Sequence, residues 1–188
     1  MGKIFKRDFL KSDNGAAAIE AIFIIPFLCF LFFSSEDLTS MIKFNKQMTD
    51  VAQVVSDTVA QTKSTITAGQ LTDYYKSVQL LLPSAQASNA HVDVYDYYLN
   101  GTTLTKRWSS ASSGGSSCAT PNTTNYSNMM ANGNDVIVAV SCMAYTPWVG
   151  TFMGGPNVLG ATSFTLTQTV AATPYLSKTI VCSGGTSC

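Results

Sequence analysis

Hydrophobic and polar residues follow three successive patterns along this 188-residue chain. An apolar run extends from Ala16 to Phe33 and contains one charged side chain, Glu20. From Ser34 onward, apolar residues recur every three or four positions, which is typical of an amphipathic helix. From His91 onward they tend to alternate, as in half-buried strands. The pattern therefore predicts helices in the first half of the chain and strands in the second.

The run Ala16–Phe33 has the length of a membrane anchor. Its eighteen residues would span about 27 Å as a helix, close to the roughly 30 Å of a bilayer hydrocarbon core. The preceding segment carries four basic and two acidic residues, and positive charge before a span favours a cytoplasmic N-terminus. We therefore expect a cytoplasmic basic leader at 1–15, a transmembrane helix at 16–33 and an exported domain at 34–188. A secretory signal peptide is the alternative, although no small-x-small cleavage site follows Phe33.

Two helices are predicted at the start of the exported domain. The first continues from the anchor, from Ser34 to about Thr65, and its apolar residues form one stripe: Met41, Phe44, Met48, Val51, Val55 and Val59. Gly69 interrupts this pattern. A shorter helix is expected from Gln70 to Leu82, because Pro83 cannot continue it.

A β-hairpin is the clearest strand prediction. His91–Leu99 alternates in part and is rich in β-forming residues, and Thr102–Trp108 would be the return strand. The Asn100-Gly101 pair between them favours a two-residue type I′ turn. Residues 109–134, in which Ser, Gly, Asn and Thr dominate, are expected to form a long loop.

Two further strands complete the predicted sheet. The apolar run Asp135–Tyr145 indicates a central strand, and Ser163–Ala171 alternates apolar residues with threonines, with Pro174–Val181 as a candidate extension. A Gly/Pro-rich connection, Pro147–Gly160, lies between them. Helices followed by strands indicate an α+β fold, in which the long amphipathic helix packs on an antiparallel sheet of about four strands.

The cysteines are consistent with export. Cys29 lies inside the predicted anchor, and the four others lie in the exported domain, which suggests two disulfides with three connectivities to choose from. We favour Cys118–Cys142 and Cys182–Cys188, since the second pair closes a short Ser-Gly-Gly-Thr-Ser loop. A metal site is less favoured, because the chain has one histidine and no CxxC motif.

Composition and motifs argue against several function classes. The formal net charge is zero and the chain has no basic patch outside the N-terminus, which argues against nucleic acid as a partner. His91 is expected to be a surface or packing residue. Asp93 and Asp96 lie three apart on a strand, so their side chains tend to opposite faces and are poor partners for acid/base catalysis. No catalytic serine or phosphate-binding motif occurs, so we expect neither enzymatic activity nor a cofactor.

The N-terminal residues resemble the processing site of type IV pilin-like proteins. Such proteins have a short basic leader ending in glycine, then an apolar helix with glutamate as its fifth residue, as Gly15, Ala16 and Glu20 have here. With the small residues after Gly15 and with Pro26 six residues after Glu20, the segment looks most like the TadE-like family of the Tad (Flp) pilus system. Ala21 departs from the aromatic residue that usually follows the glutamate.

The resemblance implies an assembly role in the inner membrane. A prepilin peptidase would cut between Gly15 and Ala16, although an uncut membrane protein is the alternative. The mature chain would be a minor pilin or pseudopilin of a Tad-type pilus or a related secretion apparatus, with its C-terminal domain outside the cytoplasm. Its partners would be the lipid bilayer, the major pilin, other minor pilins and the inner-membrane assembly platform.

Glu20 is energetically unfavourable in an apolar anchor. A carboxylate near mid-bilayer costs about 2.5–3.5 kcal/mol by insertion scales. After cleavage, the new ammonium group of Ala16 would lie one helical turn away, so Glu20 could pair with it in its own or an adjacent subunit and set the stagger between subunits. Pro26 lacks a backbone donor and would loosen the helix. The alternative is that Glu20 lies near the headgroups, satisfied by water or Lys11.

The other candidate function is a membrane-anchored exported binding domain, such as an adhesin. The polar loop at 109–134, together with Trp108 and Tyr126, would then contact a ligand. Fibre loss on deletion would favour assembly, whereas normal fibres with lost adhesion would favour binding.

Overall fold

A computed structural model of the protein describes residues 13–82, 88–101, 103–112, 118–126, 129, 134–147, 163–176, 179–185 and 188, with only the backbone at 13–18, 78, 125 and 164. The chain divides into two compact units. Met1–Met41 and Thr146–Thr162 belong to the first unit, and Ile42–Tyr145 and Ser163–Cys188 form the second.

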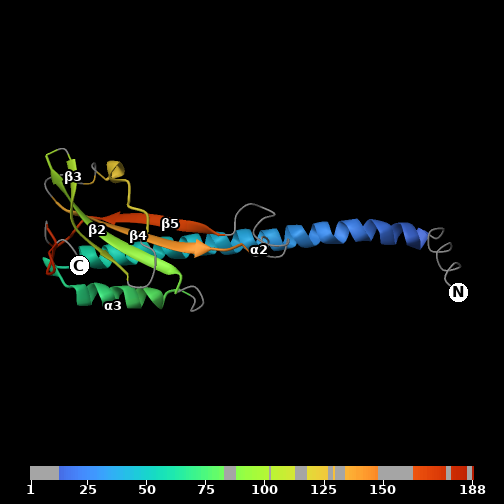
Figure 1. Ribbon diagram of the computed structural model, residues 1–188, viewed down its shortest axis with the longest axis horizontal. Coiled ribbons are helices and arrows are strands. Elements are labelled where there is room, and N and C mark those ends of the chain that lie inside the picture. The colour runs from blue at the N-terminus through green and yellow to red at the C-terminus, as the bar shows by residue number, and fades with distance from the viewer. Residues whose placement is uncertain are drawn as a thin grey trace. The chain divides into compact units, whose positions relative to one another are not determined.

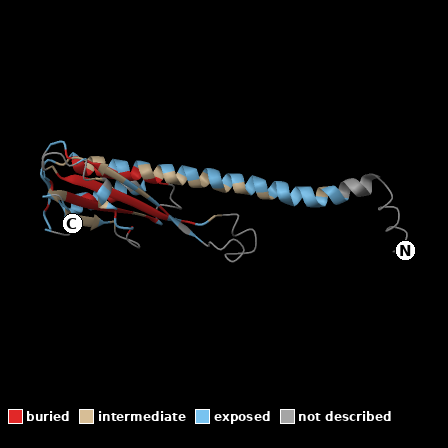
Figure 2. Cartoon of the chain, turned by 90° about the horizontal axis from the view of Figure 1, so that it is seen from above, coloured by how far each residue is buried: buried red, intermediate tan, exposed pale blue. Residues whose placement is uncertain are grey.

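The predicted anchor and the helix after it form one helix, α2 (Asp13–Ala60). Its large apolar residues between Ile19 and Phe33 are exposed, apart from the half-buried Phe30 (Figure 2). The helix ends about five residues before the predicted Thr65, where polar and β-branched residues begin. The amide of Tyr175 donates to the carbonyl of Ala60 at 3.2 Å, which satisfies one of the carbonyls left open at this end.

Within the second unit, the C-terminal part of α2 packs on the sheet as predicted (Figure 1). Its stripe is buried at Met48, Val51, Ala52, Val55 and Val59. The Ser141 hydroxyl of the sheet donates to the carbonyl of Met48 at 2.7 Å. This bond satisfies a buried polar side chain at the interface between the helix and the sheet.

The second helix, α3 (Ala68–Gln79), begins before Gly69 rather than after it. Thr67 and Gln70 form a reciprocal cap: the Gln70 amide donates to the Thr67 hydroxyl at 3.3 Å, and the Thr67 amide donates to the Gln70 side chain at 2.9 Å. This capping box nucleates the helix upstream of Gly69, which therefore lies in the first turn. The helix also ends earlier than the predicted Leu82.

The main sheet has four antiparallel strands in the order β3-β2-β4-β5. They are β2 (Ala90–Asn100), β3 (Thr103–Ala111), β4 (Val136–Tyr145) and β5 (Phe164–Ala172). This sheet confirms three predictions from the sequence: an α+β fold, a hairpin formed by β2 and β3, and a central place for β4.

The hairpin turn lies one residue later than predicted. Asn100 pairs with Thr103, so the two loop positions are Gly101 and residue 102 instead of Asn100-Gly101. Gly101 has φ +66°, and a two-residue hairpin turn requires positive φ at its first position, which glycine adopts without strain.

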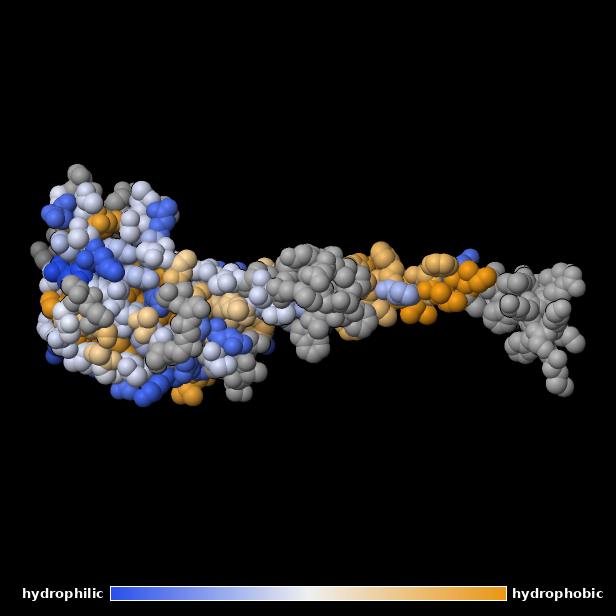
Figure 3. All heavy atoms as spheres, in the orientation of Figure 1, coloured by the Kyte–Doolittle hydropathy of each residue, from blue (hydrophilic) through white to orange (hydrophobic). Residues whose placement is uncertain are grey.

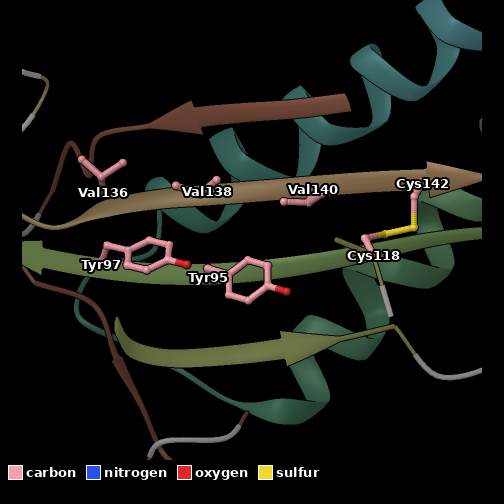
Figure 4. Packing of buried hydrophobic residues seen from close by; sticks show 7 residues of the cluster. All are labelled: Tyr95, Tyr97, Cys118, Val136, Val138, Val140 and Cys142. Carbon is pink, nitrogen blue, oxygen red and sulfur yellow. A yellow bond between two sulfur atoms is a disulfide. The ribbon is translucent and has the colours of Figure 1, made fainter. Parts of the chain in front are cut away.

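The two faces of the sheet are covered differently. Ile137 and Ser141 of β4 lie on the face that packs against α2, since Ser141 bonds to that helix. On the opposite face, buried residues of β2 and β4 surround the rings of Tyr95 and Tyr97, whose centroids are 6.1 Å apart (Figure 4). β5 has the predicted alternation in its middle: Leu166 is buried, whereas Thr165, Thr167 and Thr169 are exposed.

A small second sheet replaces the predicted extension of β5 through Pro174–Val181. β6 (Val181–Cys182) instead pairs in parallel with β1 (Thr65–Ile66). Pro174 lacks the amide that a continuing ladder needs, and Tyr175 bonds to the end of α2.

The predicted loop at 109–134 was too long, because β3 continues to Ala111 and a 3-10 turn, η1 (Thr123–Asn125), follows. Most of the predicted connection 147–160 lies outside the described residues.

Replacing Ile137 by alanine tests the packing of α2 on β4. Ile137 is fully buried on the helix-facing side, so Ile137→Ala should lower the free energy of unfolding by about 2–5 kcal/mol. Val54→Ala is the matched control, because Val54 is 45% exposed and its truncation should change the value by no more than about 0.5 kcal/mol. Urea unfolding followed by tryptophan fluorescence measures both, and equal effects would contradict this packing.

Candidate functional site

The N-terminal motif predicted from the sequence lies entirely on α2. The backbones of Gly15 and Ala16 are helical, with Glu20 one turn beyond Ala16 and Pro26 inside the same helix. Glu20 is exposed, and so are its neighbours Ile19 and Ile22. The backbone geometry therefore allows contact between position 16 and the Glu20 carboxylate within one subunit or with a neighbouring one.

The surroundings of Glu20 are apolar. Large hydrophobic side chains are exposed along this part of the helix, among them Phe23, Ile24, Phe27 and Leu28. Figure 3 shows the hydrophobic residues on its visible side. An 18-residue window of this helix has a mean hydropathy of 1.9 and no buried residue. A helix that is apolar all round and covered by no described part of the chain suits a lipid environment. Within the described residues, α2 is the one helix long and apolar enough to cross a membrane.

Pro26 lies in the interior of α2 without ending it. Because proline has no amide hydrogen, the carbonyl of Ile22 one turn earlier lacks its usual helical partner. Just after Phe33, by contrast, hydroxyls bond to the preceding turn: Ser34 donates to Phe30 O at 2.7 Å, and Thr39 to Ser35 O at 2.8 Å. Such bonds satisfy hydroxyls within the helix itself.

Both predicted disulfides are present. Cys118–Cys142 joins the segment after β3 to β4, and Cys182–Cys188 closes the C-terminal loop. The Asp93 carboxylate accepts a bond from the Cys118 amide at 2.8 Å, which fixes the backbone beside the first disulfide. Cys29, on the apolar part of α2, is free and exposed.

A buried charged cluster on the helix-facing side of the sheet was missed by the sequence analysis. Asp96 and Asp135 are fully buried, and Arg107 lies between them: its Nε is 3.3 Å from Asp96 Oδ2, and a terminal nitrogen is 3.0 Å from Asp135 Oδ1. Arg107 is the extra residue of a β-bulge, because Asp96 pairs with Trp108 and Tyr97 pairs with Lys106. The bulge thus interrupts the regular alternation of side chains along β3 and allows Arg107 to reach the two carboxylates.

Two carboxylates share one guanidinium in this cluster, so one negative charge lacks compensation. Burial, with the nearby charge of Asp135, raises the pKa of Asp96 to about 8, although Arg107 acts in the opposite direction. Asp135 also accepts the Ile180 amide at 3.2 Å, and the Trp108 indole donates to the Ile180 carbonyl at 2.8 Å. The cluster therefore holds the segment before β6 against the sheet.

The other residues considered as candidate site residues in the sequence are buried or half-buried in the domain. Trp108 is fully buried, so it cannot be the exposed ligand contact that the binding-domain alternative required. Tyr126 is half-buried and packs against the outer cluster around Tyr95. Asp93 and Asp96 do lie on opposite faces, since they pair with Val140 and Ile137 of β4. His91 is half-buried, and the described residues contain no group of metal-ligating side chains.

Comparison with known proteins returned no match to a family model, to curated proteins or to solved structures.

Replacing Asp96 by asparagine should change the pH dependence of stability. Between its ordinary value of 3.8 and about 8, the folded protein binds a proton at Asp96 that the unfolded chain has lost. The contribution of neutral Asp96 to the free energy of unfolding is therefore fully present below about pH 4. It falls by up to about 1.4 kcal/mol per pH unit as the pH rises toward 8. Asp96→Asn stays neutral, so its unfolding free energy should decline less over this range.

Asp73→Asn is the control for this measurement, because Asp73 is exposed and pairs weakly with Lys76 on the surface. Urea unfolding at intervals from pH 4 to pH 9 compares the three proteins. Parallel curves for the wild type and Asp96→Asn would contradict the account of the cluster.

Proposed function

We propose that this protein is a TadE-like minor pilin or pseudopilin, which acts in assembly of a Tad-type pilus or a related secretion apparatus. The observation that carries the proposal is the placement of Glu20. It is the one charged side chain between Ile19 and Phe33, on a helix whose apolar side chains are exposed. It lies five residues after Gly15 and six before Pro26, the spacing of the family motif.

The physical reasoning links Glu20 to an assembly contact. Apolar helices in lipid can slide along one another, because lipid tails are as apolar as their side chains. A buried ion pair between Glu20 and the ammonium group of a newly formed N-terminus at Ala16 would remove that freedom and fix one stagger. The same pair offsets the cost of placing the carboxylate in lipid.

The domain formed by residues 42–145 and 163–188 supports an extracytoplasmic location. Its two disulfides are of the kind that persist in oxidising compartments. The protein is thus proposed to be a single-pass protein of the inner membrane, with a cytoplasmic N-terminus. Prepilin peptidase would process it, and the major pilin, other minor pilins and the assembly platform would be its partners.

Glu20→Ala should leave membrane insertion intact and impair fibre assembly. Breaking one side of a buried pair costs about 3–5 kcal/mol, so surface fibres should fall by about tenfold or more. Membrane fractionation measures insertion, and electron microscopy of sheared fibres measures assembly. Glu36→Ala is the control, because Glu36 is an exposed acid on the same helix beyond the apolar run.

Wild-type fibre numbers in Glu20→Ala would contradict the pairing role. Intact mass spectrometry of the same membranes, with and without prepilin peptidase, reports cleavage separately. A chain that begins at Ala16 only in the presence of the peptidase is expected. An uncut chain in both samples would refute processing and, with it, the pairing of Glu20 with a new N-terminus at Ala16.

A further inference from the structure

The outer edge of β3 has backbone groups available for pairing. Ser112 donates inward to Val92 O at 2.9 Å, whereas the Ser109 carbonyl faces outward and accepts the Cys188 amide at 3.1 Å. Because alternate residues of a strand direct their N–H and C=O groups to opposite edges, Ala111, two residues from Ser109, also faces outward. Among the described residues, none bonds to the outward groups of Ala111.

Two hollows flank this edge. One, of about 550 Å³, is lined in part by Asp93, Tyr95, Lys106 and Thr120. The other, of about 230 Å³, lies along α3 and is lined in part by Thr72, Tyr75, Lys76 and Gln79. Both are also lined by Ser110, Ala111 and Cys188, so they meet at the edge of β3.

This arrangement suits an added strand. An extended peptide paired with Ala111 would direct successive side chains to alternate faces. Its main chain would supply hydrogen bonds, and the two hollows would receive alternate side chains, as in known cases of strand addition. The amide of Cys188 already donates to the outward carbonyl of Ser109, which shows that a main-chain donor can reach this edge.

The chemistry of the hollows indicates which side chains would fit. In the larger hollow, the Asp93 carboxylate and the Thr120 hydroxyl are suited to a hydroxyl group. In the hollow along α3, Lys76 and Gln79 can donate to a carboxylate. Lys76 is available there, since its side chain is 70% exposed and its surface pairing with Asp73 is long, at 3.9 Å.

We propose that the edge of β3 at Ala111 binds an extended segment of a partner protein by strand addition, and that hydroxyl and acidic side chains alternate along that segment. The proposal concerns the domain alone and does not depend on the pilin role.

Fluorescence anisotropy with a labelled (Thr-Glu)4 peptide tests this, using the full chain in lipid nanodiscs. Saturable binding is expected. Lys76→Glu should weaken it by about tenfold, the equivalent of one charge-assisted hydrogen bond. Lys46→Glu, a matched change at an exposed lysine of α2, should leave the affinity within about twofold.

Two further probes isolate the main-chain contribution. The same peptide N-methylated at the alternate amides that would face Ala111 lacks the donors of that strand edge, and it should not bind. Ala111→Pro removes the outward amide at an edge position where proline is tolerated, and it should abolish binding while its urea unfolding shows an intact fold.

Equal binding of the methylated peptide, or no saturable binding at millimolar concentration, would overturn the proposal. Self-association of the chain that the peptide displaces would assign the edge to a second copy, and it too would overturn the proposal.

Discussion

The structure depends on the burial of one stripe of α2 against the sheet. Met48, Val51 and Val55 are shielded from water on the face formed by β2, β4 and β5. The Ser141–Met48 bond satisfies the buried serine hydroxyl of that contact. Earlier in the same helix, apolar residues occur on all sides and no described part of the chain covers them. The apolar pattern of α2 thus changes from all-round in its first part to one-sided where the helix packs on the sheet.

The second constraint is the buried charged cluster, in which one guanidinium serves two carboxylates. Arg107 reaches two carboxylates because a bulge displaces it from regular alternation. Asp135 and Trp108 together bond both backbone groups of Ile180, which holds the chain just before β6. Since unpaired buried carboxylates are costly, the cluster specifies one position for this segment, and hydrophobic packing alone would not.

Local patterns were sufficient to predict most elements. Three predictions depend on neighbouring residues alone: the helical spacing from Met41 to Val59, a hairpin after Leu99 and a strand in the apolar run Asp135–Tyr145. The structure has the helix, the hairpin and a strand at Val136–Tyr145. The hairpin turn lies one residue later than predicted. The reciprocal cap of Thr67 and Gln70 places Gly69 inside α3, where the pattern of apolar residues predicts a break. The spacing of the cysteines favoured the pairing that the structure has.

Features that join distant segments were not predictable in this way. Asp96 could have been noticed as an acid between two strand tyrosines, but its partners lie 11 and 39 positions further along the sequence. Their meeting depends on strand register and on a bulge, neither of which is encoded locally. The parallel pairing of β1 with β6 likewise joins segments from opposite ends of the domain.

The free cysteine of the chain allows the most direct test of the lipid environment of α2. Cys29 is exposed on the apolar part of the helix, while the other four cysteines are disulfide-bonded. In sealed cells, a membrane-impermeant maleimide should fail to label Cys29 until detergent is added. A cysteine at the exposed position 38 in a Cys29→Ser background, made by Leu38→Cys, should be labelled at once. Labelling of Cys29 in sealed cells at the rate found for Leu38→Cys would contradict the account.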